Sequence, residues 1–313
     1  RASHEYLEVI DRYSSRPKSF AELIRENLMN IKAVRKFRPD AVISTDHLMS
    51  AGCCLYCRMK NIRFIFDVTD NWELVDTSPA GKLYKLIIKP LLARFSFAVT
   101  STSKRQYEYF ASRRRLYTYL IPNGINPAIE KRLAALSAPI PAAREVNFIG
   151  SLRDWYDFDL LIRVFSQLPD IELNIYGDGP LYEDLLLKAS AHPNIHIHGS
   201  IDNADTPELL MRSLFGVLPL KINELNHSTC PIKLFDYWAA GKAVISTPAE
   251  EVLRIGGDAV LFADSSEGFI TCIRDLLSGV ELAERLGNAG KAKIKDVHNY
   301  HVIADNFINI LDT

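Results

Sequence analysis

The segment Ser228–Thr247, STCPIKLFDYWAAGKAVIST, decides the fold of this 313-residue chain. Pro231 suits the first turn of a helix, because its missing N–H would have no partner there in any case. Ser228, Thr229 and Cys230 come just before it, where a hydroxyl can cap the free amides of the helix. The segment therefore predicts a helix that begins at about residue 231.

Helical spacing places Ile232, Phe235 and Ala239 on one face, which we expect to contact a core. Gly241 stands where helices end in a left-handed residue. The apolar residues 243–246 then predict a short buried strand. The whole segment is typical of one helix-to-strand unit of an α/β domain.

Lys233 and Asp236 are three residues apart and share a second, polar face near the start of this helix. A helix N-terminus attracts phosphate through its free amides and its dipole. Lys233 adds a full positive charge there, and the carboxylate one turn later can accept hydrogen bonds from sugar hydroxyls. These groups predict a site for a nucleotide diphosphate that needs no metal. The alternative is a surface ion pair between the two side chains.

Helical and strand patterns alternate along the rest of the chain, which is typical of parallel sheets with covered faces. Ligands bind such sheets at the carboxyl ends of the strands, where residues 45–47 and 67–72 lie. The predicted strands are 41–44, 62–66, 97–100, 116–121, 145–149, 171–176, 194–198, 215–219, 243–246 and 258–262. The predicted helices are 17–37, 48–59, 82–95, 104–111, 158–168, 181–191, 206–213, 266–278, 280–297 and 300–312. We expect residues 128–144 to be irregular and helix 82–95 to kink at Pro90.

Composition is that of a globular protein, with 48% hydrophobic and 24% charged residues. The formal net charge of −1 gives no reason to expect nucleic acid as a partner. No apolar run approaches the roughly 20 residues that span a bilayer. Five cysteines, an odd number, argue against a disulfide framework and predict a reducing cytoplasmic location. Cys53, Cys54 and Cys57 lack a second pair for zinc, so we expect them in a core.

The pattern P-x-K-L-x-D-Y-x-x-x-G-K-x-V resembles the donor-site helix of retaining nucleotide-sugar glycosyltransferases of family 4. The similarity extends from about Arg38 to Leu311 and includes NFIGSL, ELNIYGDGP, NIHIHGSI and LGNAGKAKIK. This resemblance implies the GT-B fold, in which two doubly wound Rossmann-like domains face a cleft. It also implies retention at the anomeric carbon and no obligate metal.

The resemblance divides the chain into three parts. Residues 1–121 match the acceptor-side domain, 122–299 the nucleotide-sugar domain, and 300–313 the helix that crosses back to the first domain. The first part supplies only about four strands, where the family usually has around seven. We therefore expect the chain to be N-terminally incomplete, also because it begins at Arg1.

In the family motif, two glutamates are separated by seven residues. Asp236 matches the second, which the resemblance assigns to the donor ribose, whereas Ser228 occupies the place of the first. Asp236 belongs to the predicted donor site, together with Ser228, Thr229, Cys230, Pro231 and Lys233.

Four further residues are donor-site candidates, and each has an ordinary structural explanation. Gly150 follows a buried strand and would allow close approach of a ligand. Arg153 suits phosphate but is equally a solvated loop residue. Gly177 is explained by a tight turn. Ile201 matches the region where the family contacts the nucleobase, or it is a core isoleucine.

Asp67 and Asp70 are the catalytic candidates, because they follow a strand beside the expected cleft. Family members often place a histidine near this point, whereas this chain has carboxylates. Capping of the next segment by Asp70 is the alternative. His47, at another strand end, is more often structural in such a position.

Residues 81–95, GKLYKLIIKPLLARF, carry apolar side chains four apart, with Lys82, Lys85, Lys89 and Arg94 around them. Residues 113–115 add three arginines. This pattern predicts contact with an anionic membrane surface. The alternative is a core helix with solvated lysines.

The sequence thus predicts a glycosyltransferase of the hexosyltransferase type, which moves a sugar from a nucleotide-diphosphate sugar to a glycan or lipid-linked acceptor. The expected location is the cytoplasm, at the inner face of the plasma membrane. Two alternatives are a nucleotide-sugar 2-epimerase-like isomerase and a non-catalytic nucleotide-sugar-binding subunit.

Overall fold

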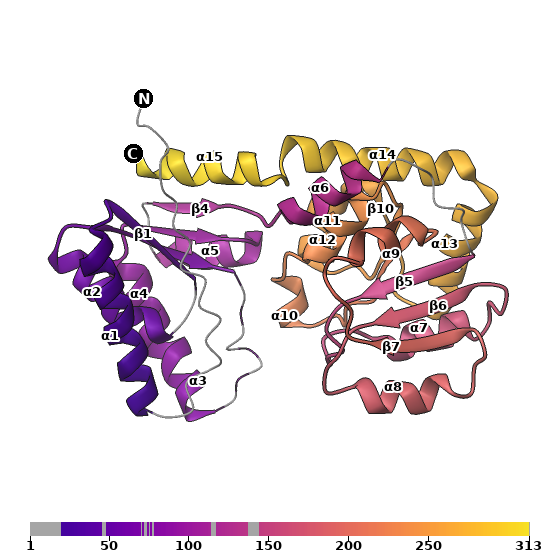
Figure 1. Cartoon of the computed structure of the whole chain (residues 1–313), viewed down its shortest axis with the longest axis horizontal. Coiled ribbons are helices and arrows are strands. Elements are labelled where there is room, and N and C mark those ends of the chain that lie inside the picture. The colour runs from indigo at the N-terminus through magenta and orange to yellow at the C-terminus, as the bar shows by residue number, and fades with distance from the viewer. Residues whose placement is uncertain are drawn as a thin grey trace.

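The computed structural model describes residues 20–45, 48–69, 71, 74, 76, 78–113, 117–136 and 144–312 (Figure 1). They form two α/β halves, each built on parallel strands, as the alternating sequence pattern predicts. The predicted α/β class is therefore confirmed.

The first half contains one four-stranded parallel sheet, whose order β1-β2-β3-β4 follows the chain. Its strands are β1 (Ala41–Thr45), β2 (Arg63–Val68), β3 (Ala98–Ser101) and β4 (Thr118–Leu120). Successive side chains of a strand point to opposite faces. Phe64 and Phe66 therefore pack on one face of the sheet and Ile65 on the other.

Four of the five described helices of the first half, all but the short helix 79–83, pack on the face of the sheet that carries Phe64 and Phe66. The five helices are α1 (Phe20–Phe37), α2 (Ala51–Met59), α3 (Pro79–Leu83), α4 (Lys89–Phe95) and α5 (Lys104–Arg113). A 3₁₀ turn, η1 (Leu48–Ser50), precedes α2, and a π-helical turn, η3 (Tyr84–Ile88), joins α3 to α4. Cys53, Cys54 and Cys57 are buried in this core, as predicted.

A π-helical turn lies directly before Pro90, inside the predicted helix 82–95. Proline has no N–H for the preceding turn and its ring crowds the carbonyl four residues back. The chain widens by one residue before it, so the N–H of Lys89 donates to the carbonyl of Tyr84. The helix therefore continues through Pro90 to Phe95.

The second half contains two three-stranded parallel sheets, β5-β6-β7 and β10-β9-β8. Their strands are β5 (Glu145–Ile149), β6 (Glu172–Tyr176), β7 (Ile195–Gly199), β8 (Gly216–Leu218), β9 (Val244–Ser246) and β10 (Val260–Phe262). The sheets meet edge to edge, because Leu214 N donates to Glu145 O at 2.8 Å. Asn147 N donates to Ser213 Oγ at 3.0 Å beside it. The strand order therefore reverses between β5 and β8.

One large hydrophobic core unites the helices and strands of the second half. Its helices are α6 (Pro127–Ala135), α7 (Phe158–Phe165), α8 (Tyr182–Ala189), α9 (Thr206–Arg212), α10 (Glu224–His227), α11 (Ile232–Ala239), α12 (Glu250–Gly256), α13 (Ser266–Ser278) and α14 (Val280–Asp296). A 3₁₀ turn, η4 (Gly257–Ala259), leads into β10. The prediction that residues 128–144 are irregular is wrong over α6, since Asn126 caps this helix and Pro127 opens it.

The last helix, α15 (Tyr300–Leu311), extends along the first half of the molecule (Figure 1). Ile303 and Ile310 pack against Ile65, Ala98 and Ile121, on the sheet face opposite to α1 and α2. The final segment therefore ties the two halves of the chain together.

Candidate functional site

The reversal of strand order between β5 and β8 marks the expected ligand site of the second half. From β5 the chain proceeds to β6 and β7 on one side, and from β8 to β9 and β10 on the other. The connections that leave the two central strands diverge, so their carboxyl ends form a crevice where ligands of α/β proteins bind. Gly150 follows β5 directly, and the chain reaches α11 after β8.

Lys233 of α11 lies against the backbone of Gly150. A Cβ atom at residue 150 would overlap Cε and Nζ of Lys233, so only glycine permits this approach. The Lys233 Nζ lies 5.7 Å from the ring centre of Phe148 and 5.4 Å from that of Tyr156. Among the described residues no carboxylate pairs with it. The crevice therefore contains a half-buried cation that an anion can reach.

The N-terminus of α11 is not capped by a side chain, contrary to the sequence prediction. Its first helical residue is Ile232, and Pro231 is the capping residue. The Ser228 hydroxyl bonds instead to the carbonyls of Glu224 and Leu225, at 3.0 Å each. Thr229 Oγ1 likewise donates to Leu225 O at 2.8 Å. Because the hydroxyls bond back to α10, the first amides of α11 remain for an anion.

Asp236 is half-buried one turn further along α11, so the surface ion pair considered above is wrong. Its Oδ1 is buried and has no hydrogen-bond partner in the part of the chain that the structure describes. Burial raises the pKa of this carboxyl to about 6, and the positive charge of Lys233 opposes the rise. A buried acceptor without a partner is costly, and a ligand hydroxyl would relieve that cost.

The core-facing residues of α11 differ partly from the prediction. Ile232 is 52% exposed, whereas Phe235, Leu234 and Trp238 are fully buried. Neighbours therefore enclose α11 on most of its circumference. Gly241 ends it in the predicted left-handed conformation, with φ of 71°.

Gly177 contacts the backbone of Gly150 rather than open space. A Cβ at residue 177 would overlap the carbonyl oxygen of Gly150. The N–H of Gly177 donates to Gly199 O at 2.7 Å, and that of Gly150 to Tyr176 O at 2.9 Å. This close packing of the two turns fixes the position of the Gly150 backbone next to Lys233.

The remaining donor-site candidates lie nearby but make fewer contacts. The exposed guanidinium of Arg153 lies 5.3 Å from the ring centre of Trp155. Ile201 is half-buried in the loop after β7. Cys230 is buried, and its carbonyl accepts a bond from Asn123 Nδ2 at 2.9 Å.

Asp67 lies within β2, next to Thr100 of β3. Thr100 Oγ1 donates to Asp67 Oδ1 at 2.6 Å. Burial raises the pKa of the Asp67 carboxyl, and the bond from Thr100 opposes this rise. Of the other residues singled out at these strand ends, Asp46, His47, Asp70 and Trp72 lie outside the described residues.

Side chains of the first half reach across to the donor-side motif. Asn71 Nδ2 donates to Ser228 Oγ at 2.8 Å, and Lys89 Nζ donates to Asn71 Oδ1 at 3.2 Å. Arg105 pairs with Glu224 at 2.7 Å. Ser228, at the first acidic position of the motif, is thus a link between the halves as well as a donor-site candidate.

A second junction was not predicted. The ring of His298 stacks on Phe235 with centroids 4.4 Å apart, and its Nδ1 lies 2.9 Å from Asn123 O. Burial lowers the pKa of His298 to about 4, so the ring is neutral at pH 7. No pattern in the sequence indicates that His298 would pack against Asn123. This junction anchors α11 to the connection between the halves.

Within the described ranges, no three His, Cys, Asp or Glu side chains gather in a way that could hold a metal ion. The donor set of the crevice consists instead of an ammonium group, backbone amides and one carboxylate.

Comparisons with known proteins agree with this architecture. The structure resembles crystal structures of HepE from Anabaena in complex with UDP (TM-score 0.70, 14% identity, 91% of this chain and 81% of that one). It also resembles the UDP-forming trehalose-phosphate synthase from Burkholderia xenovorans in complex with glucose-6-phosphate (TM-score 0.71, 12% identity, 94% and 78%). TarM from S. aureus matches with a TM-score of 0.68 and 13% identity over 92% of this chain and 59% of that one. These likenesses show that the fold is GT-B.

A curated relative, described as a putative teichuronic acid biosynthesis glycosyltransferase TuaH from Bacillus subtilis, is 28% identical over 103 residues. The match covers 33% of this chain and about a quarter, 26%, of the relative. The family model described as "Glycosyl transferase-like" matches residues 153–309, which is half of the chain and includes α11 and its surroundings. The chain therefore belongs to the glycosyl transferase-like family.

Proposed function

We propose that this protein transfers a sugar from a nucleotide-diphosphate sugar to an acceptor bound between its halves. The observation that carries the proposal is the packing of Lys233 over Gly150 at the crevice between β5 and β8. Asp236, one turn away, has a buried oxygen without a partner among the described side chains. A diphosphate at Lys233 and a ribose hydroxyl at Asp236 would satisfy both groups.

In this proposal, residues 122–299 bind the donor, residues 1–121 bind the acceptor, and residues 300–313 join the two. The structures of HepE and TarM contain UDP, which supports a uridine diphosphate sugar as donor. The curated relative is described as acting in teichuronic acid biosynthesis, which supports a cell-envelope glycan as acceptor. We propose a cytoplasmic location for the protein as well.

The chemistry of this chain would be electrostatic. The first amides of α11 and the ammonium group of Lys233 stabilise the negative charge that develops on the departing diphosphate. Arg153 can add a second charge from its loop. Gly150 and Gly177 act through the backbone, by keeping the approach to Lys233 open. Asp67 is the proposed catalytic carboxylate on the acceptor side. The transfer would retain the configuration at the anomeric carbon.

A panel of UDP-sugars, incubated with and without acceptor glycans, tests this function. Transfer predicts that UDP and a glycosylated product appear together, and only when the correct acceptor is present. Conversion of the donor without acceptor and without UDP release would indicate an epimerase. UDP binding without turnover of any donor would indicate a non-catalytic subunit.

We further propose that the first half contacts an anionic membrane surface through the segment α3–η3–α4. Five large apolar side chains of this segment are exposed, with Leu86 at 73%. They are Leu83, Leu86, Ile87, Leu91 and Phe95. The alternative of a core helix is therefore wrong for this face. Among the described residues, no helix is long and apolar enough to cross a bilayer.

The basic residues around this face are fewer than expected. Lys82, Lys85 and Arg94 are exposed, but Lys89 is only 3% exposed and cannot reach a membrane. Arg113 lies 3.8 Å from the ring centre of Tyr109 in its own helix, and residues 114 and 115 lie outside the described ranges. Three exposed cations would contribute about 1 kcal/mol each near an anionic leaflet.

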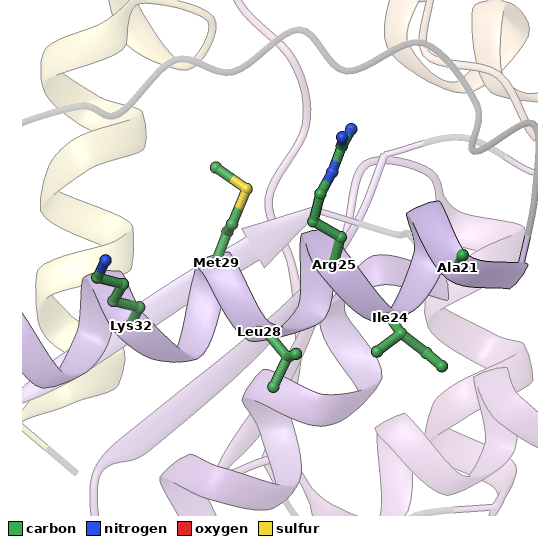
Figure 2. A pocket seen from close by; sticks show the side chains of 6 residues that line it. All are labelled: Ala21, Ile24, Arg25, Leu28, Met29 and Lys32. Carbon is green, nitrogen blue, oxygen red and sulfur yellow. The ribbon is translucent and has the colours of Figure 1, made fainter.

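The neighbouring helix α1 also exposes apolar side chains. Ile24 and Leu28 project from one side of α1, and Arg25 and Lys32 project elsewhere (Figure 2). Leu55 and Met59 of α2 are exposed as well. Exposed apolar side chains thus occur on α1 and α2 as well as on the segment α3–η3–α4.

Sedimentation with vesicles tests the membrane proposal. The protein should pellet with anionic vesicles and less so as salt rises, because salt screens the attraction. A variant with Lys82, Lys85 and Arg94 changed to Gln should stay in the supernatant, as should Leu86→Asp. Lys131→Gln on α6 is a control that should pellet as the wild type does. Equal pelleting with neutral and anionic vesicles, or none with either, would contradict the proposal.

A further inference from the structure

A cavity of about 160 Å³ lies between the two halves, apart from the crevice at Lys233. Most of its walls belong to the first half, from α4, α5 and the turn η3, and Ser228 and Glu224 close it from the second half. Neither Lys233 nor Asp236 nor Gly150 lines it. Whatever occupies this cavity is therefore not the diphosphate of the donor, although Ser228 connects the two places.

Gln106 of α5 lines this cavity and is only 3% exposed. Both its Oε1 and its Nε2 are buried and have no hydrogen-bond partner in the described parts of the chain. An amide has two donor hydrogens and two acceptor lone pairs. Leaving such groups unpaired costs roughly 1–3 kcal/mol each. A ligand in the cavity would supply the missing partners.

The chemistry of that ligand follows from the side chains around Gln106. A sugar hydroxyl both donates and accepts, so neighbouring hydroxyls of one ring can pair with both ends of an amide. Tyr109 and Phe110 add aromatic walls, with ring centres 4.9 Å apart. The cavity is smaller than the roughly 300–1,000 Å³ of drug-sized sites, which fits one ring rather than a chain of sugars.

The charge of the walls indicates a ring with an anionic substituent. Of the residues that the structure describes, three cations line the cavity, Lys85, Lys89 and Arg105, against the one carboxylate of Glu224. Arg105 pairs with Glu224, so the cation of this wall that remains for an anionic ligand is Lys85. Lys85 is exposed at the edge, and no ion pair joins it to another described residue.

We propose that this cavity is a subsite for an anionic sugar of the acceptor, such as a uronic acid or a sugar phosphate. Gln106 binds the ring hydroxyls, and Lys85 binds the carboxylate or phosphate at the entrance. This inference rests on the proposed function, since it identifies the acceptor class of the same cleft. Gln106 and Lys85 are then determinants of specificity, and the donor is held separately at Lys233.

Binding of glucuronate and of glucose 6-phosphate, measured by NMR titration in the presence of saturating UDP, tests the subsite. Both should bind, and neutral glucose should bind at least threefold more weakly. Gln106→Leu, which keeps the volume but removes the amide, should weaken binding of both at least tenfold. Its melting temperature should be unchanged or higher, because it removes unpaired buried groups. A structural amide would instead make this variant less stable.

Lys85→Gln should weaken binding of the two anionic sugars at least threefold and leave glucose unchanged. Lys82→Gln, one turn earlier and not in the cavity wall, is the matched control and should change neither. UDP affinity should stay within twofold in all three variants.

The outcomes separate this inference from the proposed function. Normal UDP binding with no binding of either anionic sugar, or with binding that Gln106→Leu does not weaken, would overturn the subsite alone. Equal affinity for glucose and glucuronate would overturn its anionic character. If the wild-type protein does not bind UDP, the proposed function itself is overturned.

Discussion

Helix α11 and the segment α3–η3–α4 both carry lysines among apolar side chains, yet they distribute them in opposite ways. In α11, Phe235 and Trp238 are fully buried, and the polar pair Lys233 and Asp236 is only half-buried. In the segment 79–95, five large apolar side chains are exposed while Lys89 is buried. Lysine among apolar side chains thus lines an internal ligand site in one half and borders an apolar outer surface in the other.

The two elements therefore differ in how much the burial of their side chains stabilises the free protein. Burial of apolar area stabilises α11 by about 25 cal/mol per Å², which offsets the unpaired oxygen of Asp236. The segment 79–95 gains little from its exposed side chains until a second surface covers them. We therefore expect α11 to be sensitive to substitution in the free protein, and the segment 79–95 to be sensitive only when a partner surface is present.

Truncation of matched apolar residues tests that comparison most strongly. Phe235→Ala removes a fully buried ring and should cost about 3–5 kcal/mol of unfolding free energy. Leu86→Ala removes a side chain that is 73% exposed and should cost less than about 0.5 kcal/mol. Urea denaturation of both variants measures the two values. Similar losses for the two variants would mean that the segment 79–95 contributes to the core of the free protein.

The turn that supports Gly150 should be almost as sensitive. Gly177→Ala forces a Cβ onto the carbonyl of Gly150 and, at a φ of 141°, strains the backbone. The expected cost is about 2–5 kcal/mol, measured by urea denaturation.

Gly257→Ala is the matched control for this variant, because φ there is 53° but the nearest atom to an added Cβ lies at 3.9 Å. It should cost about 1–2 kcal/mol, the backbone strain alone. If the two variants are equally stable, contact with Gly150 does not matter for the turn.

Acid should weaken the α11 side of the molecule through His298. The pKa of His298 is about 4 in the folded protein and about 6.5 in an unfolded chain. Between these values the unfolded state binds more protons, so stability falls as pH falls from 6.5 to 4, by about 2–3 kcal/mol. Stability curves of wild type and His298→Phe should therefore converge on acidification.

Asp236 contributes with the opposite sign, because its pKa is about 6 when folded and near 3.9 when unfolded. Its penalty grows as pH rises between these values and is common to both proteins, so it cancels in the difference. Parallel stability curves for wild type and His298→Phe would contradict the neutral, buried state of His298.

Much of the fold follows from sequence patterns because strand alternation, glycine positions and apolar runs are local signals. Gly241 and the strands β5 to β10 lie close to where the patterns predict them. Helix α6 was missed although Asn126 and Pro127 form a start signal, because the following residues lack a strong apolar period. The short helix α10 has four residues, too few for any period to appear.

The site was predicted in part, and its errors have physical causes. Lys233 and Asp236 lie in the crevice, but their burial depends on the neighbours of α11, which are distant in the chain. The hydroxyls of Ser228 and Thr229 can either accept from the amides of α11 or donate to the carbonyls of α10. They donate to the carbonyls of α10. Gln106 and His298 gave no pattern at all, since each is defined by what another element brings next to it.

We propose that Lys233 binds the diphosphate of a nucleotide-sugar donor at the crevice above Gly150. Calorimetry of UDP binding to wild type, Lys233→Ala and the control Lys242→Ala tests it most directly, with uridine as the ligand that lacks phosphates. Lys233→Ala should weaken UDP binding by about 1–3 kcal/mol, the range of a charge-assisted hydrogen bond. Uridine binding should be unchanged, and Lys242, whose Nζ bonds to Met211 O at 2.7 Å, should have no effect on either ligand. Unchanged UDP affinity in folded Lys233→Ala would contradict the account.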